Sequence, residues 1–450
     1  MMNFLRSLNI NQWLGIACVS GFTLNLIAYY PGFLSPDSFD QYSQAASGQY
    51  NDWHSPIMAV LWGLFIKVRP GTLLILIFQL GLLWTSVYLL LSSIKSKLWY
   101  VLILLFSLAP FIQNFAAYIV KDTQMAFSWL LAVAIILRAG LSKGKLSKTE
   151  AVICFLLITY GSWVRINALP GSIALCYLLS WIIFKNKTKY IRLVSAIFVW
   201  VIIGVGHWVF DYNIIKAEKT YPQTKLYLHD LTGIYAKTGV NFYPPFLYSS
   251  SDFDTTVLRK GYHSATFDDL WVGRNGKEIY SFEDDTTVIM LQQAWAKAIR
   301  TYPNVYFNNR MEGFFYYLRI KDRGSNPHNL FAEIYPQPNF LGLSFHPNIL
   351  SKIFIRPIEK QTRMPYMKPW FWLVLNVLLF AFSGKLDKLE CRVTYKALIS
   401  SSILYLLPAF FIFPADTDFR YFYWNCIACS LAVCILIIDR FYFAKQDNKA

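Results

Sequence analysis

The chain has 450 residues, of which 55% are hydrophobic and 15% are charged. Soluble globular proteins carry about 25% charged residues, so this composition excludes an ordinary soluble domain. The formal net charge is +16, and its meaning depends on where the basic residues lie along the chain.

Long apolar runs recur along the chain. A helix needs about 20 mostly apolar residues to cross a bilayer. Runs near that length occupy residues 11–30, 72–92, 98–116, 122–138, 151–165, 169–184, 192–210, 369–383, 396–413 and 420–438. We therefore predict an all-α polytopic membrane protein with about ten transmembrane helices. The first run is long for a signal-peptide core and no small-residue cleavage site follows it, so we interpret it as a span.

A polar loop, residues 31–71, separates the first two spans. It contains a shorter apolar segment, SPIMAVLWGLFIKV at 55–68, which is below spanning length. We expect this segment to lie at the membrane surface or to re-enter the membrane.

The second long polar segment, 211–368, predicts an α-rich domain between an N-terminal membrane module, 1–210, and a C-terminal membrane module, 369–450. It is rich in aromatic residues and interrupted by Pro and Gly, and residues 286–320 indicate two amphipathic helices split at Pro303. None of the seven cysteines lies in this segment, which excludes a disulfide framework for the domain.

The basic residues indicate the orientation. One set of short connections, together with the two termini, carries 18 basic residues against five acidic ones, and the short connections on the other side carry five against six. By the positive-inside rule, both termini are predicted to be cytoplasmic and segment 211–368 to be extracytoplasmic. The net charge then reflects membrane orientation, and we expect no nucleic-acid partner.

The first outer loop begins with a helix-start pattern. Ser35 suits an N-cap, Pro36 the first helical position, and Asp37 the first turn. Asp40 follows on the same face one turn later. These acids either complement the helix dipole on a solvated face or serve a membrane substrate, because acids at a membrane edge are functional candidates.

Two further pairs of polar residues lie on the same predicted side. Asp52 and His54 precede the apolar segment 55–68, and each is either a site residue or a turn residue. Lys121 and Asp122 open the span at 122–138. Asp122 suits a helix cap, whereas a cation such as Lys121 opposes the helix dipole at that end.

Two arginines complete the outer face. Arg165 ends the span at 151–165, where snorkelling to the surface is the simplest explanation. Arg420, followed by Tyr421, begins the last span on the side that is otherwise poor in cations. An anionic partner, either Asp416 and Asp418 or a ligand phosphate, would explain Arg420 there.

This layout resembles the GT-C superfamily of integral-membrane glycosyltransferases, which use polyprenyl-phosphate-linked sugars. Members have an acid on the first outer loop, an interfacial helix in that loop, and often a second acid where an outer loop enters a later span. Asp37, with Asp40 as the alternative, matches the first acid, segment 55–68 the helix, and Asp122 in KDTQMAFSWLL the second acid.

Shorter motifs extend the resemblance. RINALPG at Arg165 and FRYFYW at Arg420 are similar to charged elements of that superfamily. DWHSP, with Asp52 and His54, and AWAKAIRTYPNVYFNNR are similar to bacterial membrane proteins described as glycosyltransferase-like. The long late loop is similar in layout to serotype-converting O-antigen glucosyltransferases.

The resemblance implies a mechanism and a location. Asp37 would act as general base on an acceptor hydroxyl, with inversion at the sugar carbon, in the bacterial cytoplasmic membrane. The departing lipid phosphate would be neutralised by Arg165, Arg420 and Lys121. Some members hold a divalent cation, Mg or Mn, which here would bind at Asp37 and Asp122. The implied partners are a lipid-linked sugar donor, a glycan or lipid acceptor, and membrane lipids.

Other functions fit the same residues. A transporter or flippase of a lipid-linked or anionic substrate would use the same charges, although its charged residues should also appear near mid-membrane. An O-antigen-ligase-like enzyme would keep the cations and recruit a histidine from among His54, His207 and His346. A receptor-like or structural protein is a fourth alternative.

Overall fold

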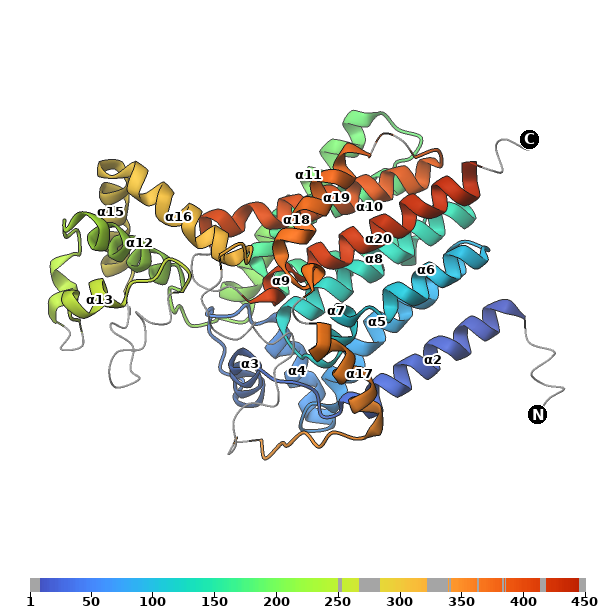
Figure 1. Ribbon diagram of the computed structural model, residues 1–450, viewed down its shortest axis with the longest axis horizontal. Coiled ribbons are helices and arrows are strands. Elements are labelled where there is room, and N and C mark those ends of the chain that lie inside the picture. The colour runs from blue at the N-terminus through green and yellow to red at the C-terminus, as the bar shows by residue number, and fades with distance from the viewer. Residues whose placement is uncertain are drawn as a thin grey trace.

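The computed structural model describes residues 9–249, 253–266, 284–321, 339, 341–361, 364–382, 384, 386–412 and 418–444. Within these ranges every regular element is a helix, and extended pairing is limited to isolated bridges. Long helices lie side by side in a bundle, and a smaller group of helices projects from one end of it (Figure 1).

Seven helices of the described chain are long and apolar enough to cross a membrane. They are α2 (Ile10–Tyr29), α5 (Leu73–Ser93), α8 (Lys121–Lys143), η1 with α10 (Ile166–Ile183), α11 with η2 (Lys189–Ile214), α19 (Leu389–Ile412) and η5 with α20 and η6 (Phe419–Phe443). The chain is therefore a polytopic helical protein, as the composition predicts.

The remaining predicted spans are shorter or broken. The run at 98–116 forms α6 (Lys97–Ser107) and α7 (Pro110–Ala117), which are bent by 51°. Pro110 explains the break, because proline cannot continue the hydrogen-bond ladder of a helix. The runs at 151–165 and 369–383 form α9 (Lys148–Val164) and α18 (Pro369–Ala381), of 17 and 13 residues. Counting the bent pair as one span gives eight, so ten spans remain a prediction.

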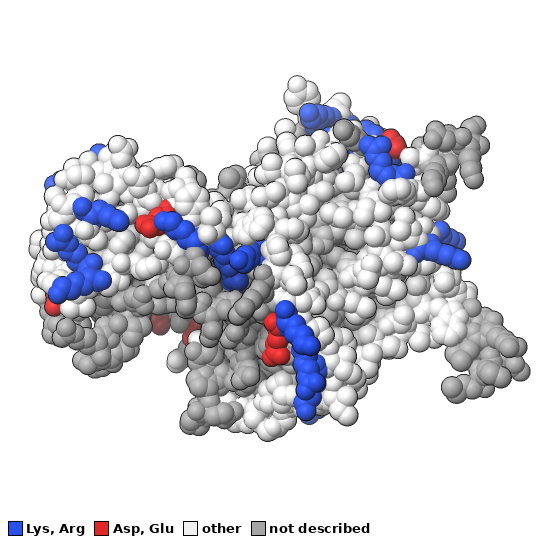
Figure 2. All heavy atoms as spheres, in the orientation of Figure 1, with Lys and Arg blue, Asp and Glu red and all other residues white. Residues whose placement is uncertain are grey.

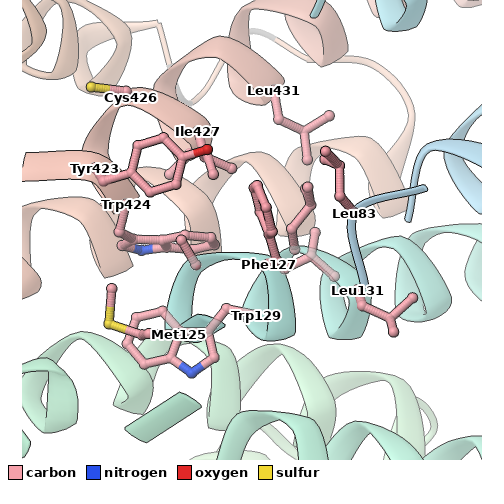
Figure 3. Close-up of a cluster of buried hydrophobic side chains, with 14 of the residues drawn as sticks. Leu83, Met125, Phe127, Trp129, Leu131, Tyr423, Trp424, Cys426, Ile427 and Leu431 are labelled. Atoms are coloured by element: carbon pink, nitrogen blue, oxygen red, sulfur yellow. The ribbon is translucent and has the colours of Figure 1, made fainter. Parts of the chain in front are cut away.

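Burial separates inner from outer helices. In α8, 72% of the apolar window is buried, whereas the figure for α2 is 11%. A helix that is apolar all round and buried forms the centre of a bundle. Figure 3 shows side chains of α8 meeting those of α20 (Tyr423–Ile438) and Leu83 of α5, and the rings of Trp129 and Trp424 lie 5.1 Å apart, edge to face.

The loop between α2 and α5, predicted to be the first outer loop, folds back onto the start of α8. Phe33 donates its backbone N–H to the Ala117 carbonyl at 2.8 Å, and Ile119 donates to the Phe33 carbonyl at 2.9 Å. The predicted cap is confirmed, because Ser35 accepts from Ser38 at the start of α3 (Pro36–Ser47). The Ser38 hydroxyl then donates to the Ile119 carbonyl at 2.6 Å. These bonds hold the first turn of α3 beside the first turn of α8.

The predicted apolar segment of this loop is a separate short helix. It forms α4 (Ile57–Val68), whose 12 residues are too few to cross a bilayer. It packs against α3, α5 and α9.

The small projecting group comprises α12 (Gln223–Thr238), α13 (Thr255–Gly261), α15 (Asp285–Thr301) and α16 (Pro303–Tyr317). It has its own apolar cluster, and Arg310 pairs with buried Asp230 at 2.6 Å. A further helix of the predicted loop domain, α17 (Ile349–Gln361), instead packs against α2 and α7 of the bundle.

Gln79 of α5 holds the end of α7 in place through hydrogen bonds to backbone carbonyls. Its side-chain nitrogen lies 3.1 to 3.3 Å from the carbonyl oxygens of Phe115, Ala116 and Tyr118. Phe115 and Ala116 belong to the last turn of α7 and Tyr118 follows it directly, so Gln79 holds the end of α7 and the start of the short link to α8.

Replacing Gln79 by Leu should destabilise the protein, because buried carbonyls that lose a donor cost about 1–3 kcal/mol. We expect a lower melting temperature in detergent, followed by size-exclusion chromatography after heating. Ser86→Ala, in the same helix, is the control, since the Ser86 hydroxyl bonds only within its own helix, to Leu82. Equal melting of the two variants would show that Gln79 does not hold this segment.

Candidate functional site

Charged and polar side chains from five parts of the chain meet at the end of the bundle that carries α3. They come from the first turn of α3, the segment before α4, the first turn of α8, the junction of α9 with η1, and η5 (Phe419–Phe422). The residues are Asp37, His54, Lys121, Asp122, Arg165, Arg420 and Tyr421. All seven are among the predicted site residues, which lie far apart in sequence.

Asp37 is the most exposed acid of the group. Its side chain is 26% exposed, against 11% for Lys121 and 9% for Arg420. Its Oδ2 atom lies 2.9 Å from the Arg420 guanidinium and 3.9 Å from Lys121 Nζ. Arg420 also pairs with Asp418 at 3.1 Å. One of the expected partners of Arg420 is therefore present, while Asp416 lies outside the described residues.

Positive charge keeps Asp37 ionised. Burial opposes ionisation of this carboxyl, but Arg420, Lys121 and a hydrogen bond from His54 outweigh it and hold its pKa well below the usual value. Asp37 is thus a carboxylate acceptor with both oxygens facing donors.

His54 lies between Lys121 and Asp37. Its Nδ1 atom is 2.5 Å from Lys121 Nζ, and its Nε2 atom is 3.6 Å from Asp37 Oδ1. A lysine ammonium can only donate, so Nδ1 must accept and the ring proton lies on Nε2, toward Asp37. Burial and Lys121 lower the pKa of His54, against the opposite effects of Asp37 and Asp40. The imidazole is therefore neutral at pH 7.

The neutral state of His54 should make stability depend on pH. The folded pKa of His54 lies below its unfolded value of about 6.5, so as pH falls through that value only the unfolded chain gains the proton. Stability should then fall by up to about 1.4 kcal/mol per pH unit until the folded pKa is reached. Asp37 stays ionised in both states through this range, because its unfolded pKa is about 3.9.

The measurement compares melting temperatures in detergent between about pH 7 and pH 5.5. We expect the melting temperature of His54→Gln to depend less on pH than that of the wild type. His346→Gln, which changes an exposed histidine, should follow the wild type. Parallel curves for wild type and His54→Gln would mean that His54 is not held neutral.

Asp122 and Arg165 form a second, deeper pair. Asp122 is fully buried and Arg165 is 7% exposed, and two contacts of 2.9 and 3.1 Å join the carboxylate to the guanidinium. A buried charge left without its partner costs about 3–5 kcal/mol. Asp122 is thus not simply a helix cap, and Arg165 does not snorkel to the surface.

Tyr421 connects the two arginines. The guanidinium carbons of Arg165 and Arg420 lie 4.4 and 4.9 Å from the centroid of its ring, and Arg420 also donates to its hydroxyl at 3.0 Å. Guanidinium groups are attracted to the faces of aromatic rings. The pair of arginines is therefore arranged about one ring and forms a cationic group beside Asp37.

Asp40 and Asp52 have other partners. Asp40 accepts from the side chain of Gln44, one turn along α3, at 2.7 Å. Asp52 accepts from the Tyr212 hydroxyl and from both the backbone and the hydroxyl of Thr220, at 2.6 to 2.9 Å. Asp52 thereby fastens the first outer loop to the chain that enters α12. The assignment of Asp52 to substrate binding stays a prediction. The contacts of Asp52 with Tyr212 and Thr220 do not favour it.

Sequence reasoning missed one contributor to the site. Tyr317 of α16 donates its hydroxyl to the backbone carbonyl of Tyr421 at 3.0 Å and is 2% exposed. It therefore joins the projecting group to η5. Tyr317 lies in an aromatic-rich helix where nothing in the local pattern separates it from its neighbours, so no sequence signal identified it.

The donor set does not favour a divalent cation at Asp37 and Asp122. Both oxygens of Asp122 face Arg165, and Asp37 faces Arg420 and Lys121. Divalent cations need several oxygen ligands, and in the part of the chain that the structure describes no three His, Cys, Asp or Glu residues are grouped to hold a metal. Metal binding stays a prediction.

No protein-family model, curated protein or solved structure matches the chain. The resemblance to the GT-C superfamily therefore stays a prediction from short motifs. The geometry of the charged site is the remaining basis for assigning a function.

Proposed function

We propose that the protein is a membrane glycosyltransferase of GT-C type. It transfers a sugar from a polyprenyl-phosphate-linked donor to a hydroxyl of a cell-envelope glycan or lipid, on the outer face of the bacterial cytoplasmic membrane. The observation that carries this proposal is a partly exposed carboxylate, Asp37, flanked by both Arg420 and Lys121 at one end of an apolar helix bundle. A base beside cations suits transfer of a group away from a phosphate at a membrane surface.

In the proposed reaction, Asp37 acts on the acceptor hydroxyl and the lipid phosphate leaves. Asp37 accepts the proton of the acceptor hydroxyl as its oxygen attacks the anomeric carbon. The new carbon–oxygen bond forms as the bond from that carbon to the phosphate oxygen breaks, and the phosphate leaves with the bonding electrons. General-base assistance of this kind contributes about 10²–10⁴-fold in rate. Attack opposite the leaving group inverts the configuration at the anomeric carbon.

The cations serve the leaving group. Arg420 and Lys121 lie next to Asp37 and bind the phosphate, where negative charge develops. Arg165 is held behind them by Asp122 and acts through Tyr421, because both guanidinium groups face the same ring. Lys121 has a second function, since its contact with His54 points the Nε2 proton at Asp37 and orients the carboxylate.

Donor binding activates the base. Without donor, Arg420 and Lys121 hold the pKa of Asp37 well below its usual value, and a carboxylate with so low a pKa is a weak base. A donor phosphate shares the same two cations and reduces their effect on Asp37. The carboxylate therefore becomes more basic when the sugar to be transferred is in place.

The first test compares neighbouring carboxylates. Asp37→Asn should reduce transfer from radiolabelled polyprenyl-phosphate sugars to membrane glycan by at least about 100-fold. Asp40→Asn is the matched control, because Asp40 lies on the same helix but bonds to Gln44, and it should keep most of the activity. Both variants must show the wild-type elution profile in size-exclusion chromatography. Full activity of Asp37→Asn would overturn the assignment of the base.

The labelled donor lipid also distinguishes an enzyme of this type from a transporter and from a ligase-like enzyme. Movement of intact labelled lipid across reconstituted vesicles without transfer would indicate a transporter or flippase. Transfer that survives in Asp37→Asn but is lost in a histidine variant would indicate a ligase-like enzyme.

A second test concerns the timing of activation. The pH dependence of kcat/KM reports ionisation in the free enzyme, and that of kcat reports ionisation in the complex. Because the donor draws the cations away from Asp37, the acidic limb of kcat should lie at higher pH than the acidic limb of kcat/KM. Coincident limbs in steady-state assays would show that the donor leaves the pKa of Asp37 unchanged.

A further inference from the structure

A surface outside the charged site, on α17, has a composition suited to the edge of a membrane. Three basic residues, Lys352, Arg356 and Lys360, are spaced four apart and exposed. Residues at this spacing form a row along one side of a helix. Figure 2 shows such a row of Lys and Arg side chains over the position of α17, with acidic atoms along one side. None of the three forms an ion pair with another described residue.

The position of α17 is set by the last turns of α2. Asn348 caps α17 by accepting from the Ser351 N–H at 2.9 Å and donates its side-chain nitrogen to the Ile27 carbonyl at 2.8 Å. The rings of Phe354 and Tyr29 lie 5.9 Å apart. In Figure 1, α17 lies across the end of α2. The basic row is therefore held at the level where a candidate span ends.

The surface of α2 shows what surrounds that level. Only 11% of its apolar window is buried, although its length and hydropathy suit a membrane span. A bare apolar span of this kind is covered by lipid. Next to its end, Ile349 and Ile353 of α17 are 78% and 59% exposed. Ile349 and Ile353 share the exposed side of α17 with the three cations, so apolar side chains and long basic side chains meet the same surroundings.

We propose that α17 binds anionic phospholipid headgroups through Lys352, Arg356 and Lys360, with Ile349 and Ile353 among the acyl chains. Basic residues at a membrane surface attract anionic lipid by about 1 kcal/mol each, and their aliphatic stems allow the charged ends to reach the headgroups. This inference is independent of the proposed enzymatic activity, because no residue of the charged site takes part.

The test titrates the full-length protein in detergent with phosphatidylglycerol and with phosphatidylcholine of the same acyl chains, and measures bound lipid by native mass spectrometry. The wild type should bind phosphatidylglycerol more tightly. In the K352Q/R356Q/K360Q variant this preference should fall by about 10- to 100-fold. The control K237Q/K297Q/R300Q removes three charges from the projecting group and should keep the preference.

A photoactivatable phosphatidylglycerol then locates the contact. It should label a peptide from α17 in the wild type, and an excess of inorganic phosphate should not displace it, because the acyl chains contribute to binding. Displacement by phosphate would assign the row to a soluble anion and overturn the lipid proposal. So would an unchanged preference in K352Q/R356Q/K360Q, an equal loss in the control, or equal binding of both lipids by the wild type.

Discussion

Charge that is buried at the end of an apolar helix bundle must be paired, and this requirement governs the arrangement of the whole site. Asp122 lies fully inside the protein, so Arg165 must meet it with two contacts. Arg420 likewise needs Asp37 and Asp418. The Asp122–Arg165 and Asp37–Arg420 pairs join segments that are distant in sequence, and Asp37 and Arg420 come from the first and last parts of the bundle. The pairing thus connects the ends of the chain as well as the groups of the site.

The two acids of the site, Asp122 and Asp37, differ in how exposed they are. Asp122 is fully buried and both of its oxygens face Arg165, so an acceptor hydroxyl has no access to it. Asp37 also has both oxygens facing donors, but its side chain is 26% exposed. In the proposed mechanism, the difference in role between Asp122 and Asp37 therefore follows from exposure rather than from residue type.

Uncharged polar contacts hold these charges in place. Gln79 donates to three carbonyls at the end of α7 and directly after it, and Ser38 donates to the Ile119 carbonyl just before α8. In an apolar environment an unpaired carbonyl is costly, so such bonds position the backbone closely. Asp52 performs the same task on the other side by joining the first outer loop to the chain that enters α12. Flexibility between that loop and the projecting group is thereby restricted.

The sequence by itself determined the helical membrane class and the Ser35 cap, because hydropathy and capping are local properties, and it predicted most of the polar residues that meet at the end of the bundle. It did not show that Pro110 bends one span or that α17 leaves the loop domain for α2. Nor did it separate Asp37 from Asp40, or Asp52 from His54. Those outcomes depend on which groups meet across long sequence distances, and only the folded bundle brings Arg420 to Asp37 and Thr220 to Asp52. The local sequence pattern does not specify such long-range contacts, so only the tertiary structure shows them.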